Sequence, residues 1–168
     1  MTVTLADLNR LEAADFAAAI GDTFELAPWV AEAAFGKRPF ATVTDLHAAM
    51  MGMVRAQPRD KQLAFVRQHP DLAGKAARAG SITNDSKREQ ASAGLDALSE
   101  EEFARFHRLN DAYKAKFGFP FIVCVRLTDK AGILAAMERR LANARADEIE
   151  TALREIGEIV RLRLRDLA

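Results

Sequence analysis

Apolar residues recur at helical spacing along most of the chain. The stretch 45–57 and the stretch from 147 to the C-terminus each place apolar side chains at i, i+3 and i+4 intervals. These positions are Leu46, Ala49, Met50, Met53 and Val54 in the first stretch and Ile149, Leu153, Ile156, Val160 and Leu164 in the second. Because this spacing gathers apolar side chains on one face of a helix, the pattern predicts an all-α fold.

Capping residues, prolines and glycines divide this pattern into short predicted helices. The predicted helices span residues 5–10, 11–21, 28–35, 45–57, 59–68, 70–79, 100–117, about 129–143 and 147 to the C-terminus, and a further helix is expected to start near residues 83–86. The expected caps are Thr44 or Asp45 for the helix over 45–57, Thr128 or Asp129 for the helix over 129–143, and Asp147 for the last helix. In the helix that Pro28 opens, Trp29 and Phe35 are the expected core anchors. The whole of residues 1–168 is expected to form a single compact multi-helix domain.

Residues 119–126 interrupt the helical pattern with a short apolar run, FPFIVCVR. Its β-branched and aromatic residues would suit a buried strand, but the sequence offers no partner strand. An irregular or extended segment inside a helical protein leaves backbone amides and carbonyls that need partners. A ligand rich in amide-like groups is one candidate, and side chains or water are the other.

Composition narrows the function classes. The 24 Lys and Arg residues balance 24 Asp and Glu residues, so no net field favours nucleic acid or an anionic membrane. The start MTVTLADLNR lacks a basic-then-apolar leader, no window is long and apolar enough to span a membrane, and the end RDLA is not a peroxisomal signal. Together with the lone Cys124, which suits a reducing compartment, these features predict a cytoplasmic protein.

Metal and nucleotide sites are not expected. The three histidines, His47, His69 and His107, fall on different predicted elements, and the sequence has neither a histidine pair at zinc-ligand spacing nor a cysteine pair. It also has no glycine-rich phosphate-binding motif. Cys124 lies in an apolar run, which favours a buried inert thiol over a nucleophile.

The densest group of polar candidates lies in residues 69–95. His69 precedes Pro70, so it is expected at the entrance of a helix. Ser86, Glu89 and Gln90 stand at i, i+3 and i+4, which places them on one face of the next helix. On spacing alone, however, Ser86 and Glu89 fit a capping box better than a site, and a lone histidine is more often a packing residue than an acid or base.

Arg163 is a further candidate, on the last helix. It follows Ile156 by seven residues, so it lies on the flank of the apolar stripe, whereas Arg161 and Arg165 point away. An inward arginine requires an anion. That anion is either a ligand or an acidic residue of a neighbouring helix.

Taken together, the motifs resemble one enzyme family. The strings HPDLAGKAA, S-x-x-EQ, GLD and LNDAYKAKFGFPFI are similar to those of 2-oxo-4-hydroxy-4-carboxy-5-ureidoimidazoline (OHCU) decarboxylases. The resemblance extends more weakly from FELAPWVAEAAFGKRPF to the closing IVRLRLRDL, so it covers nearly the whole chain.

The resemblance implies decarboxylation of a small ureide to (S)-allantoin in urate degradation, without a cofactor or metal. It assigns His69 as general acid and Glu89 as the group that polarises the substrate hydroxyl or fixes the histidine tautomer. The substrate-binding residues that it implies are Pro70, Ser86, Glu89, Gln90, Phe121, Ile122, Val123, Cys124, Val125 and Arg163.

Two features leave alternatives open. Many family members carry a histidine and a serine or cysteine where this chain has Leu26 and Ala27, which would alter substrate fit modestly. The family often forms dimers, and Leu162, expected to be exposed, is compatible with a homodimer. The rival functions are a non-catalytic helical interaction domain and an enzyme of the same fold that acts on a related ureide.

Overall fold

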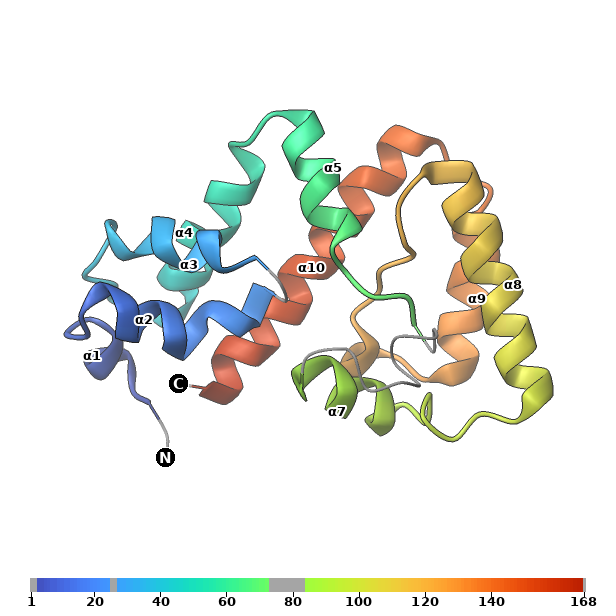
Figure 1. The fold of residues 1–168 in the computed structure, drawn as a ribbon, viewed down its shortest axis with the longest axis horizontal. Helices are drawn as coiled ribbons and strands as arrows, with labels where there is room; N and C mark the ends of the chain where they lie inside the picture. The colour runs from blue at the N-terminus through green and yellow to red at the C-terminus, as the bar shows by residue number, and fades with distance from the viewer. Residues whose placement is uncertain (1–2, 25–26, 73–83, 168) are drawn as a thin grey trace. The chain divides into compact units, whose positions relative to one another are not determined.

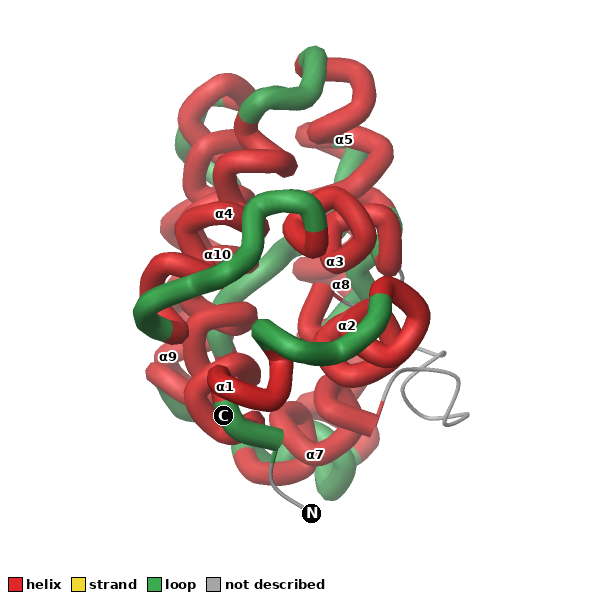
Figure 2. The backbone as a smooth tube through the Cα atoms, turned by 90° about the vertical axis from the view of Figure 1, so that its left-hand side faces the viewer, coloured by secondary structure: helices red, strands yellow, loops and turns green. Residues whose placement is uncertain are grey.

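The computed structural model describes residues 3–24, 27–72 and 84–167, and it shows these as helices joined by loops (Figures 1 and 2). The elements are α1 (Leu5–Leu8), α2 (Ala13–Ile20), the 3-10 helix η1 (Gly21–Phe24), α3 (Pro28–Phe35), α4 (Val43–Arg55), α5 (Arg59–Arg67), α7 (Asn84–Ser92), α8 (Glu100–Phe117), the 3-10 turn η2 (Val125–Leu127), α9 (Lys130–Arg140) and α10 (Arg145–Leu167). The described residues contain no β-strand, which confirms the predicted all-α class.

The chain divides into two compact units. The first comprises residues 1–68 and 157–168, and the second comprises residues 69–156. Helix α10 therefore contributes its N-terminal part to the second unit and its C-terminal part, from Gly157 onward, to the first. That residues 1–168 act as one domain stays a prediction.

In the first unit, α2, η1, α3 and α4 pack against one another. Leu8, Phe16, Ile20, Val30, Leu46 and Met50 are fully buried there. Trp29 and Phe35 are half-buried and pack at the edge of the core, with ring centroids 6.2 Å from Phe65 and 5.7 Å from Phe16 respectively. The fully buried residues of α3 are Val30, Ala31 and Ala34.

Side-chain caps mark the starts of α1, α4, α8 and α9. Ser99 caps α8, and Asp129, one of the two predicted candidates, caps α9. The cap of α4 is Thr42 and not Thr44 or Asp45, because Thr42 and Asp45 form a capping box in which Asp45 occupies the third helical position. Similarly, α10 begins at Arg145, so Asp147 is an acidic first-turn residue and not the cap.

In the second unit, α8 and α9 lie side by side (Figure 1). Tyr113 of α8 is fully buried at the centre of an aromatic cluster, with ring centroids 4.5 Å from Phe117, 5.8 Å from Phe119 and 5.3 Å from Phe121. This cluster joins α8 to the apolar segment that follows it. Edge-on and tilted pairs of this kind add to the stabilisation from burial.

Gly118 ends α8 and turns the chain into that segment. Its φ of 80° is in the left-handed region, and its N–H donates to the Lys114 carbonyl at 2.8 Å. We expect Gly118→Ala to lower the free energy of unfolding by about 1–2 kcal/mol, because a Cβ disfavours this conformation. Urea denaturation measures the change.

Gly52→Ala is the matched control for this substitution. Gly52 lies inside α4 with no atom within 4 Å of an added Cβ, and it has no positive φ. The control should therefore raise the free energy of unfolding by about 0.5–1 kcal/mol. Equal effects of the two substitutions would contradict the argument.

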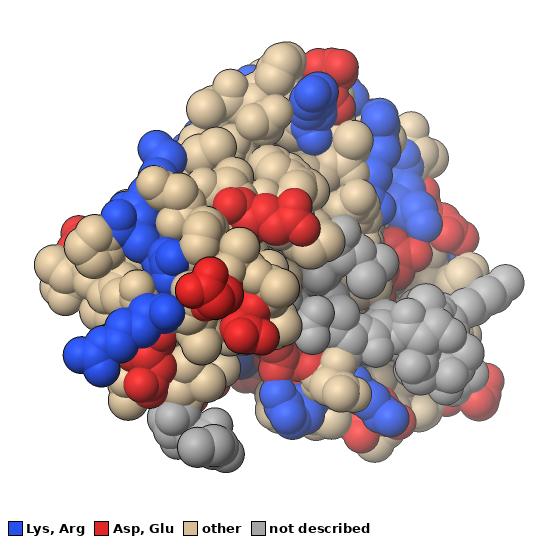
Figure 3. Space-filling view, turned by 60° about the vertical axis from the view of Figure 1, so that its left-hand side comes forward, with Lys and Arg blue, Asp and Glu red and all other residues tan. Residues whose placement is uncertain are grey.

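Charges are distributed in keeping with the neutral composition. On the face shown in Figure 3, basic and acidic side chains are interspersed. Ion pairs among the described residues include Arg161 with Glu158 at 2.7 Å and Lys130 with Glu102 at 2.5 Å. No helix among the described residues is long and apolar enough to cross a membrane.

Candidate active site

Helix α7 presents three of the predicted site residues on one face. Ser86 and Gln90, four residues apart, are both only 6% exposed, and Glu89 is half-buried. Because Asn84 and Asp85 are already helical, Ser86 lies inside α7 and is not the residue before the helix. The capping-box interpretation of Ser86 and Glu89 was therefore wrong, and their burial requires another explanation.

Burial of Ser86 and Gln90 places a hydroxyl and a carboxamide inside the protein. Together they offer donors and acceptors that suit a ligand with amide groups. Helix α7 packs against η2, the turn that follows the apolar segment. The buried polar side chains of α7 and the start of η2 thus belong to neighbouring elements of the same unit.

His69 is the first residue of the second unit and is 8% exposed. The residues after it are tied to α8. Lys114 Nζ lies 2.9 Å from Asp71 Oδ2, and Asn110 Nδ2 donates to the Leu72 carbonyl at 2.8 Å. Within this unit, α8 therefore holds the turn that follows His69.

The helix predicted over residues 70–79 is not present in its first turn. Pro70 and Asp71 are non-helical, and Leu72 is in a turn. The remainder of that prediction, residues 73–79, lies outside the described residues, as does Leu26. Ala27, the other departure from the family pattern, is fully buried.

The predicted apolar segment, Phe121–Val125, is buried throughout and non-helical up to η2. Leu127 N–H donates to the Cys124 carbonyl at 3.1 Å, which starts the 3-10 turn. The Cys124 thiol is buried, as expected for an inert cysteine. The irregular buried segment predicted near 119–126 is confirmed.

The segment is held by charged side chains that the sequence reasoning missed. Arg140 Nη1 donates to the Ile122 carbonyl at 2.7 Å, and its guanidinium lies 4.3 Å from the centre of the Phe121 ring. Glu155 Oε2 accepts a hydrogen bond from Cys124 N–H at 3.3 Å. Side chains thus satisfy part of the segment's backbone, which was one of the two alternatives.

Arg140 is paired with a buried carboxylate. Its Nε donates to Glu148 Oε1 at 2.8 Å, and the exposed fractions are 5% for Arg140 and 0% for Glu148. The Tyr113 hydroxyl donates to the same oxygen at 2.5 Å, and Asn143 Nδ2 donates to Oε2 at 2.9 Å. Burial, with the hydrogen bond to Glu148, raises the pKa of Tyr113 above its ordinary value.

The sequence held a signal for this pair. Arg140 follows Ile133 and Met137 at helical spacing, and Glu148 adjoins the buried positions Ile149 and Ala152. Each is a charged residue at an apolar-face position. Such residues are almost never fully buried unless they are paired.

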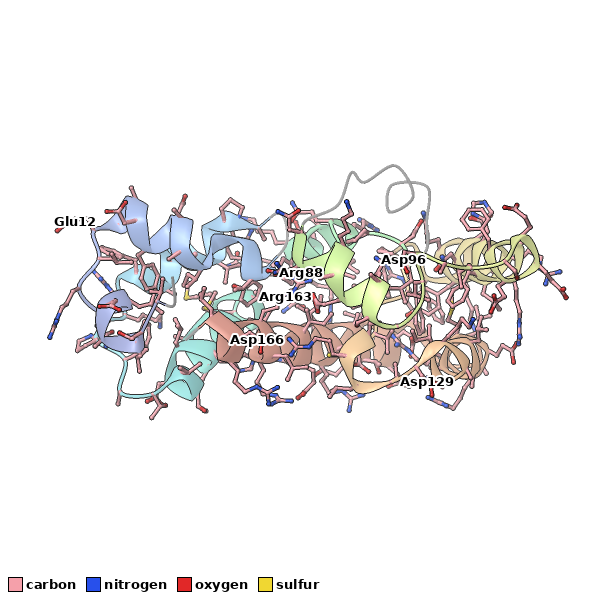
Figure 4. All side chains as sticks on the ribbon, turned by 90° about the horizontal axis from the view of Figure 1, so that it is seen from below. Glu12, Arg88, Asp96, Asp129, Arg163 and Asp166 are labelled. Atoms are coloured by element: carbon pink, nitrogen blue, oxygen red, sulfur yellow. The ribbon has the colours of Figure 1, made fainter. Side chains whose placement is uncertain are left out.

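Arg163 lies near the end of α10, on the same helix as Asp166 (Figure 4). It belongs to the first unit, whereas the other predicted site residues belong to the second. Arg163 is buried while Arg161 and Arg165 are exposed, as the helical periodicity predicted. Its Nη1 donates to the Thr23 carbonyl at 3.3 Å.

Metal ligands are not gathered in the part of the chain that the structure describes. No group of three or more His, Cys, Asp or Glu side chains there could hold a metal ion. His47 in α4 is bonded to the Gly157 carbonyl at 2.8 Å, and His107 in α8 lies 3.4 Å from Asp111.

Comparison with known proteins identifies the family. The sequence profile of OHCU decarboxylase matches residues 9–165. The chain is 43% identical over 162 residues to a 2-oxo-4-hydroxy-4-carboxy-5-ureidoimidazoline decarboxylase of Haloferax volcanii, covering 96% of this chain and 94% of that protein. The chain belongs to the OHCU decarboxylase family.

Two further similarities agree with this family membership. The chain is 39% identical to the uric acid degradation bifunctional protein PucL of Bacillus subtilis, covering 98% of this chain and 32% of that protein. Among solved structures, a crystal structure of (S)-allantoin synthase superposes with a TM-score of 0.78 at 30% identity, over 98% of this chain. This chain spans about half, 53%, of that solved chain.

The family predicted from the sequence motifs is thereby confirmed. The OHCU decarboxylase match covers His69, the group on α7, the apolar segment and Arg163. The similarity to (S)-allantoin synthase extends over both units, because it covers 98% of the chain.

Proposed function

We propose that this chain catalyses the cofactor-free, stereospecific decarboxylation of 2-oxo-4-hydroxy-4-carboxy-5-ureidoimidazoline to (S)-allantoin in urate degradation. The observation that carries the proposal is the family match over residues 9–165, because it spans every residue assigned to the reaction. The relatives named as decarboxylases and as a uric acid degradation protein support the same substrate.

The substrate explains why no cofactor is required. Its carboxylate leaves a carbon beside a ring imine, so the electron pair released with CO2 flows into the C=N bond. The protein then has to hold the carboxylate out of the ring plane and deliver one proton to one face. The apolar segment Phe121–Val125 also disfavours the localised charge of the ground-state carboxylate relative to the delocalised transition state.

His69 is the proposed general acid. An imidazole titrates near neutrality and therefore gives and takes a proton readily. Glu89 is the second proposed catalytic group. As the hydroxyl carbon becomes a carbonyl, its carboxylate accepts a hydrogen bond from the substrate hydroxyl or fixes the tautomer of His69.

The remaining residues are proposed to bind the substrate. Ser86 and Gln90, both buried on α7, supply the donors and acceptors for the ureido and ring amides. Pro70 and the backbone of Phe121–Val125 contribute further contacts. Arg163 is the proposed partner of the anionic or carbonyl oxygens, for which its planar fork of donors is suited.

The proposal is tested with freshly generated substrate. Urate is converted with urate oxidase and hydroxyisourate hydrolase, the protein is added, and circular dichroism follows the formation of (S)-allantoin. We expect an optically active product that forms faster than the spontaneous, racemic decay. A signal no faster than that decay would exclude the decarboxylase.

A panel of related ureides separates this substrate from others that the same fold could accept. The proposed substrate should show the highest kcat/KM of the panel.

Cytoplasmic location and a homodimeric state stay predictions. Leu162 no longer supports the dimer, because it is buried and not exposed as predicted.

A further inference from the structure

The backbone of the Phe121–Val125 segment is held at two places that bracket Val123. Arg140 holds the carbonyl of Ile122 from α9, and Glu155 holds the N–H of Cys124 from α10. Both side chains belong to the same unit as the segment. The segment therefore takes its shape from charged side chains and not from a neighbouring strand.

Arg140 is itself fixed in orientation. One edge of its guanidinium is bonded to Glu148, whose two carboxylate oxygens also accept bonds from Tyr113 and Asn143. The face of the guanidinium covers the Phe121 ring. With Nε bonded to Glu148 and Nη2 3.5 Å from the Tyr113 hydroxyl, the planar guanidinium directs Nη1 at the Ile122 carbonyl.

We propose that Arg140 and Glu155 are positioning residues of the decarboxylase: they hold the backbone of Phe121–Val125 in the conformation that binds the ureide. This inference rests on the proposed function, which assigns the segment's backbone to the substrate. Binding sites require such support, because small displacements of contacting groups reduce catalysis steeply.

The first test is Arg140→Lys. The lysine keeps the charge but has no planar fork, so a single ammonium cannot reproduce both the Glu148 and the Ile122 bonds. We expect kcat/KM to fall by about 10–100-fold, chiefly through a higher KM, with a similar weakening of (S)-allantoin binding.

Ile133→Ala is the matched control for stability. Ile133 is fully buried in α9, two helical turns before Arg140. It makes none of the hydrogen bonds to the segment. The control should lower the melting temperature at least as much as Arg140→Lys, yet keep KM and kcat near those of the unaltered protein.

Glu155 provides a second, less disruptive test. Glu155 is half-buried, so replacing its carboxylate does not leave a buried opposite charge without a partner. Glu155→Ala should raise KM and speed hydrogen exchange at the Cys124 amide, whereas Glu155→Gln keeps an oxygen acceptor and should restore both. If Arg140→Lys fails to fold, Glu155→Ala and Glu155→Gln decide whether the positioning role holds.

The outcomes separate the two proposals. An unaltered protein that does not accelerate the reaction defeats the proposed function, and the positioning role with it. An active protein whose folded Arg140→Lys and Glu155→Ala variants keep the same KM and kcat defeats the positioning role alone. Raised KM in both variants, with rescue by Glu155→Gln, supports it.

Discussion

His69→Asn should lower kcat for the decarboxylation by about 10²–10⁴-fold, the range that a general acid contributes. Asparagine keeps a planar polar group of smaller size but cannot exchange a proton near neutral pH. His69 is buried and is the first residue of the second unit. Helix α8 anchors the turn that follows it. The measurement is the rate of (S)-allantoin formation, followed by circular dichroism.

His107→Asn is the control for this substitution. His107 lies on α8 of the same unit, with its side chain 41% exposed and Asp111 as its neighbour. It has no proposed role, so its replacement should leave kcat unchanged. Far-ultraviolet circular dichroism must show both variants folded. A folded His69→Asn variant with the kcat of the unaltered protein would contradict the catalytic role.

Local signals in the sequence sufficed for much of the fold. Gly118 ends α8 in the left-handed conformation, and Asp129 caps α9, because both effects act within one helical turn. The buried state of Arg163 followed from periodicity alone. The irregular segment near 119–126 was predictable because its composition suits a buried strand, whereas the sequence offers no partner strand.

Tertiary contacts explain the predictions that were wrong. Leu162 was expected on the exposed side of a single apolar stripe, but α10 serves two units, and each unit buries its own part of the helix. Trp29 was expected in the core because of its size, and it packs against Phe65 at the edge of the core while staying half-buried. The burial of Leu162 and that of Trp29 are both set by tertiary contacts and not by residues adjacent in the sequence.

The candidate site also combines features that local sequence signals predict with features that depend on tertiary contacts. Spacing placed Ser86 and Gln90 on one face, and the structure buries both. Spacing alone could not decide whether Ser86 caps the helix, since that depends on whether the residues before it are helical, as Asn84 and Asp85 are. The bond from Tyr113 to Glu148 joins residues 35 positions apart, and no local pattern encodes such a pairing.

Glu148→Ala should lower the free energy of unfolding by about 3–5 kcal/mol, because it leaves the buried Arg140 without its counter-charge. The substitution also removes the acceptor of the Tyr113 hydroxyl and of Asn143. Domains are typically stable by only about 5–15 kcal/mol, so this is a large share of the total. Urea denaturation followed by circular dichroism measures the loss.

Glu158→Ala tests whether burial is the cause. Glu158 lies on the same helix and also pairs with an arginine, Arg161, but the two side chains are 44% and 45% exposed. Water solvates the arginine that remains, so this variant should lose only about 0–1 kcal/mol. Equal losses for Glu148→Ala and Glu158→Ala would show that the Arg140–Glu148 pair contributes no more than a surface ion pair. A large loss of unfolding free energy confined to Glu148→Ala would show that the fold depends on this carboxylate to keep Arg140 buried against the Phe121–Val125 segment.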